Sequence, residues 1–473
     1  MTSVSKVKRL ERSFQQSVIK EANEPQRERI SWNRLLAYLA LSLLALVAFA
    51  PTHLALLTCT VATLSIAYSL IAERVITLGT VFELGFLTLV GADIALNFNS
   101  LQRVFELRDL EAGVALHVLA FATVMTAYYC YRERPRAKAD TAPEVGTSSP
   151  SLFLLATLYV MAVASVAPRA VQRFSTGRSG SGGSAVSSDS AIEALLGAIQ
   201  HGLVISLTAL VTYTITQHYN RGLALSLAAS APLLLLVFMI GTRYLLLYAV
   251  AAPLIIALAR GIRVGRFLLT GGIIAVIAMG ATAAMRSFRT QGLSNSSLRF
   301  DPLSIFGSEG LVKTSAQLVQ YFETRSHLLG ESTLSVLTSP IPRALWSEKP
   351  TLIGYWFPRE VQAPSSFSEG HSVSFGIIGD AYADGGTIGV LLISIFIGLL
   401  LAKANAFARR AFFTGGRNLL FASLCYPTAF FAVRSPTTAL LTLAAATGII
   451  FLATAISSPR KLATSSCHSD RRS

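Results

Sequence analysis

The polar segment 286–375 contains many of the side chains that could do chemistry in this chain, eight of them basic and seven acidic. Arg343, Trp346 and Lys349 lie there in one proline-rich run, and Trp356 follows. Guanidinium and ammonium groups bind phosphate oxygens, while aromatic rings offer flat faces on which sugar rings stack. The rings could instead anchor the segment at a membrane interface. The pattern favours binding of an anionic molecule that contains sugars.

The run 369–386 carries groups suited to proton transfer. His371 precedes an apolar stretch, and Asp380 and Tyr382 enter its first turns. An imidazole or a carboxylate can act as a general base towards a hydroxyl, and histidine titrates near ambient pH. We expect His371 to be the first candidate for the base and Asp380 the second, with Tyr382 as a substrate-binding residue.

Three arginines lie outside this segment at predicted membrane edges. Arg243 lies in the tight turn 241–244 between two apolar stretches. Its planar fork suits phosphate oxygens, although it could also extend to lipid headgroups. Arg169 and Arg173 begin the predicted external loop 169–191, which continues into a Gly/Ser run. They could hold an anionic substrate or belong to a solvated linker.

Ionisable residues within apolar stretches are functional candidates by default. Glu83 and Asp93 share one predicted helix, where their spacing puts about 15 Å between them along the axis. That separation excludes a paired acid/base site, so we expect hydrogen bonds to other helices. His117 and His201 are expected to pack rather than to catalyse.

Residues 311–329 show helical periodicity, with an apolar side formed by Leu311, Ala316, Leu318, Val319, Phe322 and Leu328. A helix with one apolar and one polar face typically lies on a membrane surface. We expect this helix to bring Arg325, a candidate catalytic residue, and His327 towards that surface.

The composition predicts the fold class. The chain has 473 residues, a mean hydropathy of +0.55 and 14% charged residues. Windows of about 20 apolar residues, enough to cross a bilayer as a helix, recur along it. The sequence therefore predicts an all-α polytopic membrane protein with about twelve spans, near residues 35–51, 53–72, 75–98, 112–131, 151–168, 192–216, 223–240, 244–259, 267–285, 376–402, 418–433 and 437–457.

The distribution of positive charge predicts the orientation of these spans. With a cytoplasmic N-terminus, the inside segments hold 25 of the 40 Lys and Arg residues. The short outside loops hold seven. Segment 286–375 is left out of this comparison because the positive-inside rule applies only to short loops. We expect a basic cytoplasmic segment 1–34, spans one to nine within 35–285, an external loop 286–375, the last spans within 376–457 and a cytoplasmic tail 458–473.

Charge and cysteine content argue against other classes. The net charge of +15 is concentrated in predicted inside segments, so it indicates topology rather than nucleic-acid binding. The four cysteines lie outside 286–375, so no disulfide or Cys-based metal site is expected there. No spacing of Asp, Glu or His predicts a metal site.

Three motifs resemble those of the Wzy-type polymerases of O-antigen and related polysaccharides. They are the Gly-Thr-Arg turn at 241–243, the Ile-Pro-Arg…Trp…Lys-Pro run at 341–350 and the Gly-Asp-Ala-Tyr…Gly-Gly run at 379–386. The predicted layout also resembles that of this family, which has some twelve spans and one large periplasmic loop late in the chain. The resemblance covers topology along most of the chain and motifs between about residues 241 and 390.

The resemblance implies a glycosyl transfer at the periplasmic face of a bacterial inner membrane. The donor would be a glycan on undecaprenyl pyrophosphate, the acceptor a hydroxyl of a second lipid-linked repeat unit, and no cofactor or metal is implied. Arg243 and Arg325 would stabilise charge on the leaving pyrophosphate, and Arg343 and Lys349 would bind glycan or phosphate. A flippase and a chain-length regulator are implied as partners.

Two other functions stay open. An O-antigen ligase has the same architecture and donor but transfers a finished glycan to a lipid A core or to a protein. A flippase for lipid-linked oligosaccharides, or another transporter, is less well supported. Inverted repeats of broken helices are not evident, and a transporter has no need for a large external segment.

Overall fold

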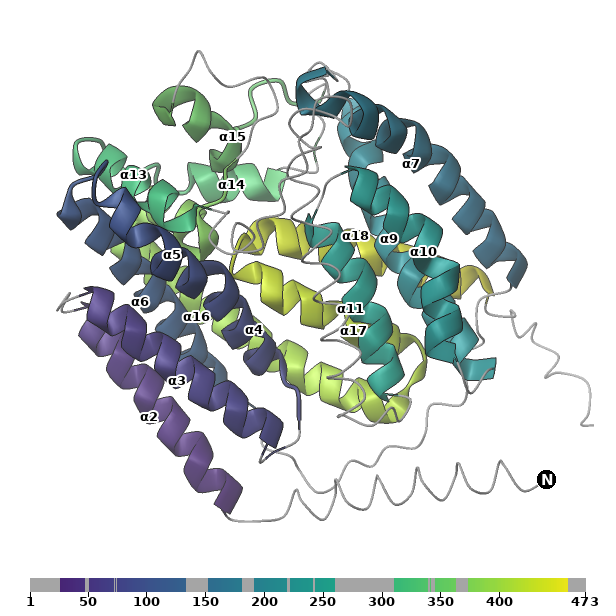
Figure 1. Cartoon of the computed structure of the whole chain (residues 1–473), viewed down its shortest axis with the longest axis horizontal. Helices are drawn as coiled ribbons and strands as arrows, with labels where there is room; N and C mark the ends of the chain where they lie inside the picture. The colour runs from purple at the N-terminus through teal and green to yellow at the C-terminus, as the bar shows by residue number, and fades with distance from the viewer. Residues whose placement is uncertain are drawn as a thin grey trace, which may run out of the picture.

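The structure is a computed structural model that describes residues 26–46, 51–71, 73, 75–132, 152–180, 191–218, 222–240, 243–259, 310–338, 341, 345–362 and 373–457. Within these ranges all regular structure is helical, which confirms the all-α class. Figure 1 shows two groups of helices, purple to blue and teal, with the green-to-yellow C-terminal helices packed against both.

The first group contains α2 (Gln26–Leu46), α3 (Pro51–Ile71), α4 (Leu78–Phe86), α5 (Ala92–Leu101) and α6 (Leu107–Tyr131). A π-helical turn, Leu87–Gly91, joins α4 and α5 into one bent helix. The second group contains α7 (Leu152–Gly180), α9 (Ala191–His218), α10 (Gly222–Ile240) and α11 (Arg243–Ala259). The C-terminal helices are α16 (Gly379–Thr414), α17 (Gly416–Ala432) and α18 (Pro436–Ser457).

Two apolar cores hold these helices together. In the first, α6 is surrounded by α2, α3, α4 and α16 and is buried along most of its length. In the second, α9 and α11 pack against α10, α17 and α18. Because α17 contacts α4 as well as α11, it ties the two groups into one body.

Six helical segments are long and apolar enough to cross a membrane, by length and composition, among the residues described. They begin at Thr52, Leu78, Leu107, Leu152, Gly376 and Pro436. Four shorter apolar helices lie at Trp32–Ala45, Gly202–Gln217, Ala228–Met239 and Leu245–Ala259. Every predicted span overlaps a helix except 267–285, which lies outside the described residues. The count of about twelve spans remains a prediction.

Helix α7 continues beyond its predicted span. It runs to Gly180, so Arg169 and Arg173 lie in its last turns rather than in an irregular loop. Pro168 lies inside the helix and does not end it. The remainder of the predicted loop, 181–190, lies outside the described residues.

The acidic residues of the bent helix α4–α5 bond to other elements, as predicted. Glu83 Oε1 accepts hydrogen bonds from Tyr38 (2.8 Å) on α2 and Ser65 (2.7 Å) on α3. Asp93 Oδ2 accepts a 2.8 Å bond from the backbone N–H of Val312, more than two hundred residues later in the chain. His117 also connects elements, with Nε2 lying 2.8 Å from Ser315 Oγ. Each of these polar groups links separate segments of the fold.

Candidate functional site

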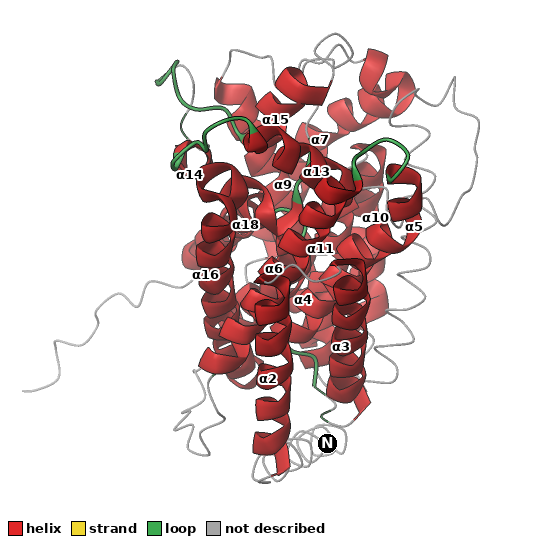
Figure 2. Cartoon of the chain, turned by 90° about the vertical axis from the view of Figure 1, so that its left-hand side faces the viewer, coloured by secondary structure: helices red, strands yellow, loops and turns green. Residues whose placement is uncertain are grey.

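Three short helices cover one end of the helix bundle. They are α13 (Leu311–Glu323), α14 (Glu331–Thr338) and α15 (Ile353–Phe357). We name them, with the described residues that join them between 310 and 362, the cap. Figure 2 shows the cap at the end opposite to the start of α2. A small apolar core of Leu318, Phe322, Ile353, Phe357, Phe375 and Ala383 joins it to α16.

The predicted amphipathic helix is present as α13, but it ends at Glu323 and the residues of its apolar face are buried within the protein. That face is buried against α5, α6 and α16. Contact is close at Gly113 of α6, where an added Cβ would lie 3.1 Å from the backbone nitrogen of Ala316. Burial against protein therefore replaces the expected burial in lipid.

Two carboxylates at the start of α16 hold α14 in place. Asp384 accepts 2.8 Å bonds from the backbone N–H groups of Ser332 and Thr333, and a 2.5 Å bond from the Thr333 hydroxyl. Asp380 accepts bonds from Ser332 Oγ at 2.6 Å and Thr437 Oγ1 at 3.1 Å. An acid at a helix N-terminus satisfies exposed N–H groups and the helix dipole. Asp380 and Asp384 thus connect α14, α16 and α18.

Tyr382 lies between these two carboxylates in sequence but faces a histidine. Its ring meets His327 edge to face at 5.5 Å between centroids, and His327 stacks on Phe322 at 5.2 Å. The other side of His327 lies against Gly386, where an added Cβ would come within 2.9 Å of Nε2. Gly386 has φ +56°, which favours glycine and breaks the helical path of α16. Nδ1 of His327 is buried without a hydrogen-bond partner in the described structure.

Arg325 and Trp356 come together through Tyr321. The Arg325 guanidinium lies 4.2 Å from the centre of the Tyr321 ring and donates to its hydroxyl. On the same ring, Trp356 packs with centroids 5.8 Å apart. Arg325 is exposed and Trp356 is half-buried, so they present a cation beside an aromatic surface. The sequence predicts a catalytic role for Arg325 and a substrate-binding role for Trp356, and the structure brings these two residues together.

For most of the remaining predicted site residues, the structure describes only the backbone or does not describe the residue. Lys349 Nζ donates a 2.6 Å bond to the carbonyl of Ile341, and Trp346 is 38% exposed. Arg343 and His371 lie outside the described residues. Arg243 is the first residue of α11, and Arg169 and Arg173 lie in α7. For these three arginines only the backbone position is described.

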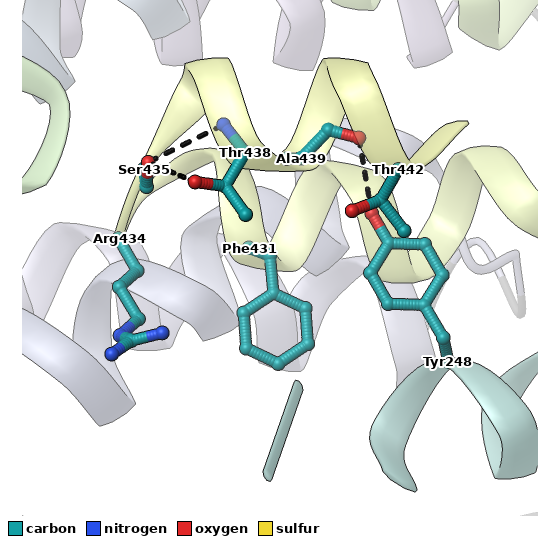
Figure 3. A pocket seen from close by; sticks show the side chains of 7 residues that line it. All are labelled: Tyr248, Phe431, Arg434, Ser435, Thr438, Ala439 and Thr442. Carbon is teal, nitrogen blue, oxygen red and sulfur yellow. Dashed lines mark hydrogen bonds between the residues drawn. The ribbon is translucent and has the colours of Figure 1, made fainter. Parts of the chain in front are cut away.

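A hollow lies beside the cap between α11, α17 and α18. It is a shallow depression whose roughly 220 Å³ of space includes open solvent, and it is lined by Tyr248, Phe431, Arg434, Ser435, Thr438, Ala439 and Thr442. Figure 3 shows the Arg434 guanidinium at one side and the Phe431 and Tyr248 rings beside it, below Ser435, Thr438 and Thr442. The two rings stack with their centroids 5.7 Å apart. One cation, several hydroxyls and two rings suit a phosphate joined to an apolar chain.

The hollow is adjacent to the carboxylates of α16. Thr437, which donates to Asp380, lies in the same turn as Ser435 and Thr438. Ser374, beside the cap, donates a 2.5 Å bond to the carbonyl of Arg434. Arg243 begins α11 five residues before Tyr248, or about 7.5 Å along the helix axis. Two arginines therefore belong to the same end of the bundle as the cap.

Arg434 and the hydroxyl residues around it were not predicted from the sequence. Arg434 is a single cation in a short turn, and neither its spacing nor its neighbours marked it as a phosphate ligand. A weak signal was present in the run Arg-Ser-Pro-Thr-Thr at 434–438, which combines a cation with three hydroxyls beside an apolar stretch. Ser332 and Thr333 were missed because their partners lie about fifty residues away in sequence.

No group of three His, Cys, Asp or Glu side chains that could hold a metal ion occurs among the residues described. Comparisons of the chain with protein-family models, with curated proteins and with solved structures found no match.

Proposed function

We propose that this protein polymerises oligosaccharide repeat units carried on a polyprenyl pyrophosphate, at the outer face of a bacterial inner membrane. The observation that carries the proposal is the hollow that contains Arg434, three hydroxyl residues and two stacked aromatic rings. A pyrophosphate with an apolar tail needs such a combination of cation, hydrogen-bond donors and apolar surface. The cap beside it offers the exposed Trp346, the half-buried Trp356 and Arg325 for the glycan.

The reaction breaks one bond and forms another. An acceptor hydroxyl oxygen attacks the anomeric carbon of the donor glycan, and the bond from that carbon to the pyrophosphate oxygen breaks. The electron pair leaves with the pyrophosphate, and a base takes the hydroxyl proton. Arg434 and Arg243 stabilise the negative charge that develops on the leaving group.

The base in this scheme is His371. Asp380 is the weaker candidate because each of its oxygens already accepts a hydrogen bond, from Ser332 and Thr437. Those bonds fit a positioning role, in which Asp380 holds the turn that carries Arg434 against α14. Tyr382 packs on His327 and supports the cap beside the glycan.

The test is the length distribution of surface polysaccharide in a host that lacks the gene. We expect the ladder to collapse to single repeat units and to be restored by the wild-type gene. Arg434→Ala and Arg243→Ala should each lower polymerisation by about 10²-fold, the usual cost of removing one donor to a developing charge. Lysine at either position should restore activity only in part, because it lacks the bidentate fork.

The matched control is Arg103→Ala, which removes an exposed arginine at the same end of the bundle. It should leave the ladder unchanged, with all variants inserted in the membrane at equal levels. Loss of all surface glycan, with lipid-linked polymer accumulating, would identify a ligase instead. Failure of labelled lipid-linked sugar to cross the membrane would identify a transporter, and an unchanged ladder would discard the polymerase.

A further inference from the structure

Three arginines gather at the end of the bundle opposite to the cap. Arg34 lies on α2, Arg132 follows the last residue of α6 and Arg409 lies on α16. Arg132 interacts electrostatically with Arg34, and Arg409 with Arg132. Three helices that are distant in sequence therefore bring like charges together.

Arg34 does not simply extend into water, and Arg132 and Arg409 are half-buried. Arg34 is only 9% exposed, and its guanidinium lies 4.8 Å from the centre of the Tyr68 ring. It also donates to the Ser65 carbonyl and to the Tyr129 hydroxyl, both at 3.3 Å. An arginine needed only to orient a helix in the membrane can remain solvated. Burial of Arg34 indicates an additional role.

Among the residues that the structure describes, the negative charge nearby does not balance the three arginines. Glu73 interacts with all three arginines and forms an ion pair with Arg34 at 3.9 Å. Glu83 lies deeper and bonds to Tyr38 and Ser65. Neither Arg132 nor Arg409 has an ion pair in the described structure. Charges removed from water require compensation, so an anion would stabilise the site.

Buried polar atoms without partners surround the same place. Within the described part of the chain, Ser69 Oγ and Tyr128 Oη are buried without a hydrogen-bond partner, and Glu73 Oε2 makes no hydrogen bond in addition to its 3.9 Å ion pair with Arg34. Ser69 lies one turn before Glu73 in sequence, and Tyr128 interacts electrostatically with Arg132 and Arg409. Unpaired buried groups are rare and costly. Two of these three are hydroxyls that can donate to a phosphate oxygen.

The elements around the cluster are fixed in position. The turn that leads into α4 is held by the Asn405 Oδ1 of α16, which accepts a 3.1 Å bond from the Leu78 N–H. Tyr426 of α17 donates a 3.3 Å bond to the carbonyl of Ile76. The cluster is therefore a built site between helices rather than a set of mobile surface cations.

We propose that Arg34, Arg132 and Arg409 form a binding site for a phosphate group, supplied by a lipid headgroup of the adjacent leaflet or by a free phosphate ester. Guanidinium forks match phosphate geometry, and basic pockets between membrane helices on the cytoplasmic side bind lipid headgroups. Positive charge predicts that this end is cytoplasmic. The site is independent of the proposed polymerase reaction, which uses the opposite end.

The experiment measures binding to the purified full-length protein. Native mass spectrometry would count retained phosphatidylglycerol against phosphatidylcholine, and calorimetry would measure inorganic phosphate. We expect Arg132→Gln with Arg409→Gln to weaken binding by about a hundredfold, or about tenfold for each guanidinium removed. The matched control is Lys403→Gln with Arg410→Gln, which removes the same charge from exposed positions of α16 and should bind as the wild type.

Tyr128→Phe provides a second variant that removes one hydroxyl and keeps the ring, so folding is preserved. It should weaken binding by about fivefold. Retention of phosphatidylglycerol by the wild type but not by the double variant would establish a lipid site, and binding of inorganic phosphate alone would establish a site for a soluble ester. Absence of both, an equal effect in the control pair, or unaltered binding in Tyr128→Phe would overturn the proposal.

Discussion

At the scale of single residues, Asp384 shows how an acid in the candidate site performs a structural task. Both of its oxygens accept backbone N–H groups at the start of α14, and one also accepts the Thr333 hydroxyl. These bonds satisfy donors that the first turn of a helix leaves unpaired. Asp384 therefore fixes the cap to α16 across about fifty residues of sequence.

Replacing Asp384 by alanine should destabilise the cap by about 1–2 kcal/mol, the usual cost of removing a helix N-cap. Asparagine should cost less because its carbonyl oxygen still accepts one N–H. Limited proteolysis within 331–338 and thermal unfolding of the purified protein measure the effect. Glu360→Ala, at an exposed position of the same cap, is the control. Equal protease sensitivity in the two variants would contradict the assigned role.

Residue types could be predicted from the sequence better than residue partners. Asp380, Tyr382, Arg325 and Trp356 were identified because charged and aromatic residues are unusual in so apolar a chain. Their contacts could not be predicted, since Ser332 and Thr437 reach Asp380 from segments about fifty residues away on either side. Arg434 was missed for the same reason, because the residues that line the hollow with it come from separate helices that only the fold brings together.

At the scale of elements, the packing of α6 on α16 depends on one glycine. A Cβ added to Gly398 would lie 2.4 Å from the carbonyl oxygen of Val124 and 2.6 Å from the Cβ of Ala127. Backbone atoms cannot move aside as a flexible side chain can. Small residues let membrane helices approach closely, so Gly398 sets the separation of the two helices that connect the cap to the opposite end.

Gly398→Ala should destabilise the protein by about 1–3 kcal/mol, because overpacking forces the two helices apart. Gly448→Ala is the matched control, since a Cβ there meets no atom within 4 Å. The control should be neutral or slightly stabilising, as alanine favours helix more than glycine does. Thermal unfolding in detergent compares the two variants. Similar melting temperatures would show that α6 and α16 are less tightly packed than the structure indicates.

Helices were predictable because apolar runs are long, but their ends and faces were less so. The continuation of α7 to Gly180 crosses Pro168 and a run of polar residues that favoured a loop. The apolar face of α13 was predicted to meet lipid, because periodicity identifies a buried face without identifying what buries it. Here α6 covers it, through contacts at Gly113 and His117.

At the scale of the whole molecule, the two ends differ in chemistry. One end carries the cap, the carboxylates of α16 and the hollow with Arg434. The other carries the arginine cluster around Glu73. The helix end at Asp93, which is predicted to lie near the outside, contacts Val312 of segment 286–375. Leu78 and Asn405 mark two helix ends that are predicted to lie near the inside, and these two residues bond to each other. These contacts join ends that the charge distribution predicts to lie on the same side, and the side of the membrane stays a prediction for each end.

Orientation is the prediction on which both functional proposals depend. In a variant with its native cysteines replaced, Leu345→Cys, at an 81% exposed position of the cap, should react with a membrane-impermeant maleimide in intact spheroplasts. Lys403→Cys, at the opposite end of α16, should react only after lysis. The reason is the positive-inside bias, which gives the short predicted inside segments 25 of the 40 basic residues. The reverse labelling would place the hollow in the cytoplasm, where it could not meet a glycan polymerised outside, and would move the arginine cluster to the outer leaflet. Labelling of both positions from one side would mean that α16 does not cross the membrane.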